Sequence, residues 1–218
     1  MFTIGDIIQS YIGSKKLPQS FTDKVRQISK QDSNDWDYRT TRCAKSILTA
    51  VCFRETAIAS AESTDSMIYQ PIGLYYSMFH MSLAMLWINP RIEKIQLKEI
   101  HHKALINLVK SNLVDAKLLK PSFGSLLTSL KELRESCNYQ FGYQEDLNIV
   151  LANAIEKTDL EFDAAIEYIH QVLDVSKSLF SVKVGIGDGF GDDILDSYLS
   201  KEHKENVFHY LVSHGLST

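Results

Sequence analysis

One arginine in an apolar, helix-like segment is the clearest candidate for chemistry in this 218-residue sequence. Arg134 and Asn138 are four residues apart, so a helix places them on one face, and Tyr139 follows directly. A guanidinium in apolar surroundings needs an acceptor, which could be a backbone carbonyl, the carboxylate of Asp146 or a phosphate group. Arg134 is therefore expected either to anchor the protein interior or to face a ligand.

The sequence contains seven histidines, a residue type whose unperturbed pKa lies near neutral pH, but their spacing does not predict a metal site. His80 lies in a mostly apolar stretch, where a histidine is usually a satisfied core residue. The neighbours His101 and His102 diverge by about 100° on a helix. His203 and His209 are six residues apart, not the four that align two ligands on a helix. No metal is therefore expected.

Other reactive patterns also fail. The three cysteines have no metal-ligand spacing and are too few for a disulfide framework, so they predict buried thiols in a reducing cytoplasm. The sequence has no Gly-x-Ser-x-Gly motif, no phosphate-binding loop ending in Gly-Lys-Ser/Thr and no Cys-x-x-Cys pair. The glycine-rich residues 185–191 (GIGDGFG) lack the strand-to-helix context of a nucleotide loop, so no cofactor is expected.

Helical periodicity dominates the segments that must position these residues. Apolar residues recur every three or four positions, which predicts five helices. The segments with this pattern are 40–62, 74–88, 98–114, 123–137 and 147–173. The second carries two apolar stripes, so it is expected at the centre of a bundle with neighbours on more than one side. Asn89 and Pro90 should end it, because proline disfavours helix in the preceding residue.

The predicted fold is all-α: an up-and-down bundle of about five core helices with helical extensions at both ends. Residues 1–38 are the N-terminal extension, 39–178 the bundle, and 179–218 a glycine-rich hinge followed by an amphipathic helix from about Asp192 to Ser213. Residues 181–184 are the only strand candidate.

The sequence predicts neither a membrane span nor a secretory signal. Residues 66–90 contain no acidic or basic side chain, but their polar residues make the run unsuitable for a spanning helix. The first residues lack a basic start followed by a long apolar run. A cytoplasmic location is expected.

Charge is unevenly distributed, although the net charge is only −4. Residues 91–120 contain seven Lys or Arg and three acids, whereas residues 132–174 contain ten acids and two basic residues. The two segments could be ordinary solvated faces. They could also be complementary faces of a dimer, or a phosphate-binding strip beside an acidic surface.

Four short segments together resemble the HEPN superfamily of small helical bundles. Residues 74–80 (LYYSMFH) are similar to the family's YYAMFH segment, and residues 102–105 (HKAL) to its histidine-led helix. Residues 130–139 (LKELRESCNY) resemble its LRxxADY pattern, and residues 162–169 (FDAAIEYI) its last helix. Order and spacing agree over roughly residues 40–175. The resemblance implies a helical bundle that forms a homodimer.

Ribonucleases of this superfamily carry an arginine followed four to six residues later by a histidine, and they cleave RNA without metal. After Arg134 the corresponding positions hold Tyr139, Gln140 and Phe141. Tyrosine is a poor general base at pH 7, because its unperturbed pKa is near 10. The chain therefore resembles the branch of the superfamily that lacks the nuclease motif.

Three functions are expected from these features. The leading hypothesis is a non-catalytic module that binds RNA, a nucleotide or a protein partner as a dimer, in a bacterial defence or toxin–antitoxin context that the resemblance implies. One alternative is a metal-independent endoribonuclease that uses Arg134 with His102 or His80. The other is a structural protein-interaction module. The candidate ligand-binding residues are Arg134, Asn138, Tyr139, Tyr76, His80 and His102.

Overall fold

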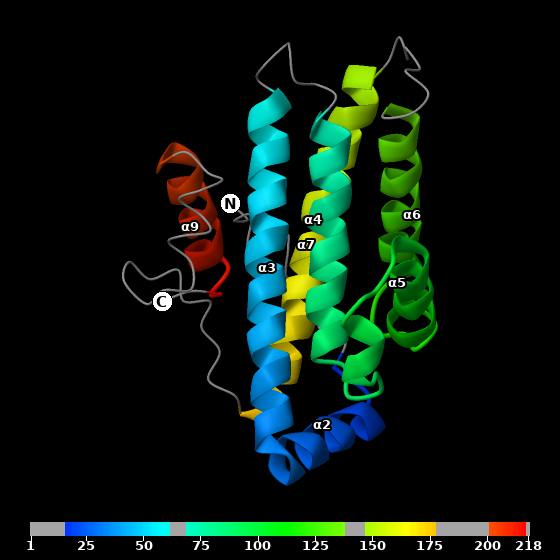
Figure 1. Ribbon diagram of the computed structural model, residues 1–218, viewed down its shortest axis with the longest axis vertical. Helices are drawn as coiled ribbons and strands as arrows, with labels where there is room; N and C mark the ends of the chain where they lie inside the picture. Colours follow the sequence, from blue (N-terminus) through cyan, green and yellow to red (C-terminus); the bar gives the residue numbers. More distant parts are fainter. Residues whose placement is uncertain (1–15, 62–68, 138–146, 178–200, 217–218) are drawn as a thin grey trace, which may run out of the picture.

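The computed structural model describes residues 16–61, 69–137, 147–177 and 201–216 (Figure 1). Within these ranges the chain forms seven α-helices, one 3-10 turn and one π-helical turn, and no β-strand. The helices are α2 (Gln19–Gln31), α3 (Ser33–Ala61), α4 (Tyr69–Trp87), α5 (His102–Val109), α6 (Pro121–Glu135), α7 (Leu147–Ser176) and α9 (Lys201–Ser213). The short turns are η1 (Lys94–Leu97) and η2 (Lys110–Val114). The predicted all-α bundle is confirmed.

Helix α4 is the central element of the bundle. It contacts α3, α5, α6 and α7, and Figure 1 shows it between α3 and α6 with α7 behind. One predicted stripe has no exposed surface and consists of Leu74, Met78, Met81, Met85 and Ile88. The other exposes at most 8% of any residue and consists of Tyr75, Phe79, Ser82 and Leu86. Burial on both stripes confirms that α4 has partners on more than one side.

Helices α3 and α4 approach each other closely at Gly73. A Cβ atom added there would lie 2.8 Å from the Cβ of Ala57 and 3.0 Å from the carbonyl oxygen of Phe53. Carbon atoms do not pack at 2.8 Å, so only glycine permits this approach. The contact brings Phe53 of α3 within stacking distance of Tyr76 on α4, with ring centroids 5.3 Å apart.

The segment predicted as one helix over residues 98–114 is divided. Helix α5 begins at His102, because the chain first forms η1, whose N-terminus is closed by reciprocal hydrogen bonds between Glu93 and Gln96. After α5 the helix widens into η2, and the chain then turns at Lys117, which has a φ of 58°. The late start places His102 in the first turn of α5, where it contacts α4.

The two extensions pack on the bundle by apolar residues. Helix α2 buries Phe21 and Val25 completely and contacts α3 and α7. Residue 38, the predicted end of the N-terminal extension, lies inside the continuous helix α3. Helix α9 contacts α3, and Figure 1 shows it on the side of α3 away from α6. The predicted hinge, its strand candidate and the predicted start of the last helix lie outside the described residues.

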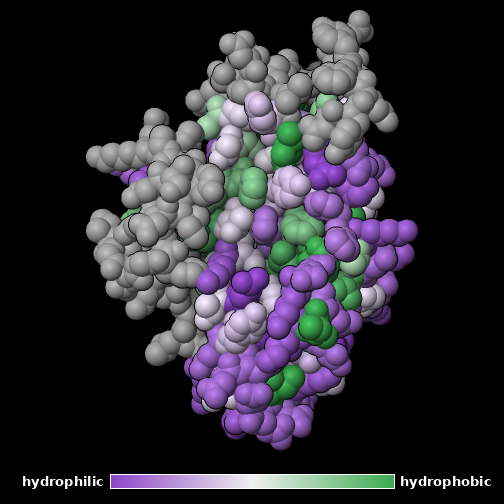
Figure 2. All heavy atoms as spheres, in the orientation of Figure 1, coloured by the Kyte–Doolittle hydropathy of each residue, from purple (hydrophilic) through white to green (hydrophobic). Residues whose placement is uncertain are grey.

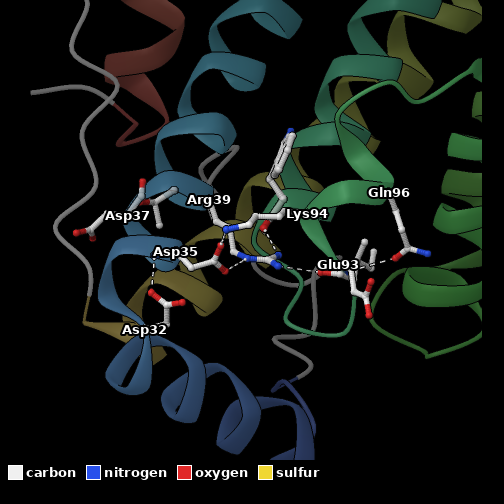
Figure 3. Close-up of polar contacts among 10 residues, drawn as sticks. Asp32, Asp35, Asp37, Arg39, Glu93, Lys94 and Gln96 are labelled. Atoms are coloured by element: carbon white, nitrogen blue, oxygen red, sulfur yellow. Dashed lines mark hydrogen bonds and ion pairs between the residues drawn. The ribbon is translucent and has the colours of Figure 1, made fainter.

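A buried arginine, Arg39, lies where the N-terminal part of α3 meets the C-terminal end of α4 (Figure 3). Arg39 of α3 donates to the carboxylate of Asp35 over 2.7 Å and to the carbonyl oxygens of Trp87 and Ile92 over 3.2 and 3.1 Å. The carbonyl of Trp87 ends α4, where helix geometry leaves it without an intrahelical partner. Lys94 adds a 2.5 Å contact to Asp35. Burial opposes ionisation of Asp35, but the bonds from Lys94 and Arg39 outweigh it and lower its pKa.

The surface is mostly polar. In Figure 2 the described residues on the face shown are largely hydrophilic, with hydrophobic residues scattered among them. All seven Lys and Arg residues between positions 91 and 120 are exposed. In the part of the chain that the structure describes, no helix combines the length and apolarity needed to cross a bilayer.

Candidate ligand-binding site

Arg134 lies in the last turn of α6 and faces α4. Only 8% of the residue is exposed. Its guanidinium carbon is 4.7 Å from the ring centroid of Tyr75 and 5.7 Å from that of Tyr76. Both tyrosines belong to the aromatic N-terminal half of α4. The positive guanidinium of Arg134 lies against the negative faces of their rings. The rings partly compensate for the loss of water around the cation.

The hydrogen bonds of Arg134 are few and long. Its Nη1 donates to the hydroxyl of Tyr76 over 3.4 Å, and its Nη2 donates to the carboxylate of Glu135 over the same distance. The Nε–H has no acceptor among the described residues. A guanidinium has five N–H donors, and an unpaired buried charge is costly. Arg134 therefore retains unused capacity to bind an acceptor.

A tyrosine–histidine pair flanks the guanidinium. The hydroxyl of Tyr75 lies 2.6 Å from Nδ1 of His102. Burial raises the pKa of Tyr75 to about 12, so the phenol stays protonated at neutral pH and can donate a hydrogen bond to Nδ1. Desolvation, followed by the charges of Arg134 and Lys131, lowers the pKa of His102. His102 is therefore uncharged at neutral pH, and its tautomer with the proton on Nε2 accepts the hydrogen bond from Tyr75.

His80 extends the cluster by one helical turn along α4. Its ring is parallel to that of Phe53, with centroids 5.6 Å apart and an interplanar angle of 6°. Phe53 also stacks on Tyr76, so it connects His80 to the arginine site. Burial lowers the pKa of His80 to about 4. His80 is therefore neutral at pH 7 and a weak base.

Charged residues border this cluster. His101 and Lys103, on either side of His102, are exposed. Lys131 is half-buried one turn before Arg134 and contacts Glu135 over 2.8 Å. The contact with Lys131, opposed by desolvation, lowers the pKa of Glu135, which stays ionised. Cations predominate around the cluster, so it favours an anion over a cation.

The structure brings together most of the predicted site. Arg134, Tyr76 and His102 meet at the junction of α4, α5 and α6, and His80 joins them through Phe53. Asn138 and Tyr139 lie outside the described residues. The sequence did not predict that Phe53 would take part, because no pattern distinguishes it from other core aromatic residues. Tyr75 was not among the predicted ligand-binding residues.

Two other arrangements bear on function. A shallow groove between α6 and α7 is separate from the Arg134 cluster, and it is lined by Leu126, Ser129, Leu130, Glu132, Leu133, Ser136, Val150, Asn153, Ala154 and Lys157.

Within the four described ranges, no three His, Cys, Asp or Glu side chains gather as a metal ion would require.

The cluster can hold a planar or tetrahedral anion through the unused donors of Arg134, beside the half-buried rings of Tyr76 and His102. No protein-family model, curated protein or solved structure matches the chain. The likeness to the HEPN superfamily therefore rests on the sequence segments alone.

Proposed function

We propose that this chain is a HEPN-like helical module that binds a phosphate-bearing ligand, RNA or a nucleotide, without cleaving it. The observation that supports this most is the state of Arg134: a buried guanidinium against two adjacent tyrosine rings, with no carboxylate nearer than 3.4 Å among the described residues. A phosphate would supply the acceptor that the guanidinium lacks, because its oxygens match the fork of donors.

Aromatic and imidazole groups suit the rest of such a ligand. Tyr76 and His102 are half-buried beside Arg134, and His80 lies one turn further along α4. Nucleic-acid bases stack on exposed aromatic faces, and one stacked base contributes about 1–3 kcal/mol. A phosphate on Arg134 and a base near Tyr76 would together select nucleotides over inorganic phosphate.

The absence of cleavage follows from the histidines. RNA cleavage without metal needs a group that takes a proton near neutral pH. The pKa of His80 is lowered to about 4, and desolvation also lowers the pKa of His102, whose Nδ1 is engaged in a hydrogen bond with Tyr75. Both are weak bases in this setting, in keeping with the missing arginine–histidine motif.

Assembly and biological context belong to the proposal through the family resemblance alone. HEPN-like modules imply a homodimer and a place in bacterial defence or a toxin–antitoxin pair. The exposed Lys103, next to His102, would support binding of a polyanion beside the Arg134 cluster. Light scattering on the purified protein tests the dimer directly.

RNA binding tests the proposal. Fluorescence anisotropy with a labelled single-stranded RNA of mixed sequence, in EDTA, should show saturable binding, and gels should show intact RNA. Arg134→Met should weaken binding at least about tenfold, as expected for a lost charge-assisted contact. Arg134→Lys should fall between, because it keeps the charge but not the planar fork. Arg26→Met is the matched control, since Arg26 is exposed on α2.

Thermal unfolding of each variant separates loss of binding from loss of fold. Equal affinities for the wild type, Arg134→Met and Arg26→Met would exclude the site. Metal-independent cleavage that disappears in Arg134→Met would instead favour the endoribonuclease with His102 or His80. If neither RNA nor nucleotides bind at all, the structural protein-interaction module is the remaining alternative.

A further inference from the structure

Helix α9 is fixed to the bundle by a small apolar face and a well-formed C-terminus. Val207, Leu211 and Leu216 have no exposed surface. Gly215 has a φ of 63°, the N–H of Leu216 donates to the carbonyl of Leu211 over 2.8 Å, and the N–H of Gly215 donates to Val212 over 3.0 Å. This is the Schellman arrangement, which ends a helix and turns the next apolar residue inward. It also fixes the position of His214.

Both ring nitrogens of His214 face groups that accept hydrogen bonds. Nδ1 lies 2.8 Å from the carbonyl oxygen of Tyr210, and Nε2 lies 3.4 Å from the carboxylate of Asp163 on α7. The hydroxyl of Ser213 lies 3.0 Å from Nδ1 and donates a hydrogen bond to the carbonyl oxygen of Tyr210. A neutral imidazole has one N–H, whereas the imidazolium has two. The geometry therefore suits a charged His214.

The neighbours of His214 come from three helices. On α9 its ring stacks on that of Tyr210, with centroids 4.0 Å apart. On α7 the Nε2 of His170 lies 3.0 Å from the carbonyl oxygen of His214. Among the described residues, the other charged or titratable groups of this region are Arg54 and Glu55 on α3, and Asp159 and Asp163 on α7.

Arg54 is already neutralised. It contacts Asp159 over 2.7 Å, also pairs with Glu55, and lies 4.6 Å from the ring centroid of Tyr210. Asp163 consequently remains as the counterion of His214. A cation there also suits the C-terminal end of α9, where the helix dipole is negative.

We propose that α9 is a proton-linked clasp: it holds the bundle tightly when His214 is charged and more weakly when His214 is neutral. Loss of the proton removes one of the two donors and the positive charge that pairs with Asp163. The carbonyl of Tyr210 keeps the hydroxyl of Ser213 and the backbone N–H of His214, so the lost interaction is the one with Asp163. The apolar contacts of Val207, Leu211 and Leu216 remain, so the neutral clasp is weakened but not abolished. This proposal is independent of ligand binding at Arg134.

The direction of the pH effect follows from the contacts. The hydrogen bond to Asp163 raises the pKa of His214, although burial opposes it. In a detached α9 the histidine would titrate near its ordinary pKa of about 6.5. The added stability is therefore complete below about pH 6.5, while Asp163 stays ionised, and it is lost as the pH rises through the raised pKa.

Hydrogen exchange on the full chain tests the clasp. Protection of the amides of Val207 and Leu211 should fall between pH 6 and pH 8.5, after correction for intrinsic exchange and relative to α4. The decrease should reach about tenfold for each unit by which docking raises the pKa of His214. Titration of His214 by NMR supplies that pKa independently.

Two variants and one control complete the test. His214→Gln and Asp163→Asn should remove the pH dependence and reduce protection of α9 at pH 6. His209→Gln should behave like the wild type, because His209 is exposed on the same helix. Protection that does not change with pH in the wild type would overturn the proposal. So would a wild-type pH dependence that survives in His214→Gln.

Discussion

Two arginines are buried in this bundle, and their surroundings are opposite in kind. Arg39 is 6% exposed and Arg134 is 8% exposed, so both have lost most of their water. Arg39 has a carboxylate at 2.7 Å and two backbone carbonyls within 3.2 Å. Arg134 has two contacts of 3.4 Å and two aromatic rings. The first arginine joins parts of the fold, and the second keeps donors for something else.

The largest expected effect is on Arg39. Arg39→Met should lower the free energy of unfolding by about 3 kcal/mol, because it leaves two buried carbonyl groups without their donor and Asp35 with Lys94 as its remaining cation. Urea denaturation followed by circular dichroism measures this. A loss below about 1 kcal/mol would mean that solvent replaces the arginine and that the cluster does not hold α3 to the end of α4.

Arg134→Met should have the reverse profile. Its free energy of unfolding should stay within about 1 kcal/mol of the wild type, because an apolar side chain can replace an incompletely paired cation packed against two rings. RNA affinity should nevertheless fall at least about tenfold. Equal damage to stability by Arg39→Met and Arg134→Met would erase the distinction between the two arginines.

Tyr75→Phe tests the pair beside Arg134 with a smaller change. Removing the hydroxyl deletes the 2.6 Å bond to His102 and should cost about 1 kcal/mol of unfolding free energy. Because that bond favours neutral His102, its loss should also raise the pKa of His102 towards its ordinary value. A fall in the pKa of His102, measured by NMR titration, would contradict the assignment of Tyr75 as donor and His102 as acceptor.

Acid sensitivity should separate the carboxylates of the two clusters. Lys94 and Arg39 lower the pKa of Asp35 despite burial, so its contribution to stability is present above about pH 4 and is lost as the pH falls through the lowered value. Between pH 5 and pH 3, the Asp35→Asn variant should lose less unfolding free energy than the wild type. Glu135→Gln should change it less, because Glu135 is more exposed. A larger effect at Glu135 would reverse the comparison.

The sequence predicted the helices because apolar spacing is a local property. The two stripes of α4 and the face of Arg134 could be deduced in this way. The late start of α5 could not, because η1 depends on the reciprocal bonds of Glu93 and Gln96, and helical periodicity does not encode these. Division of residues 98–114 is the clearest departure from the predicted helices.

The sequence could not predict contacts between residues that are far apart along the chain. Arg39 bonds to the backbone of Trp87 and Ile92, which are 48 and 53 positions away, and a carbonyl acceptor has no residue signature. Arg54 illustrates the same point, since it meets the ring of Tyr210 only after α3 and α9 pack. Arg134, Tyr76 and His102 were each predicted as ligand-binding residues, but their contacts form only when α4, α5 and α6 pack.

The side-chain Nε–H signals of the two arginines test the central claim most directly. In a ¹⁵N-labelled protein titrated with single-stranded RNA in EDTA, the Arg134 signal should shift and saturate with the affinity measured by anisotropy. The Arg39 signal should stay in place. An Arg134 signal that does not move at saturating RNA would contradict a phosphate-binding role for this arginine.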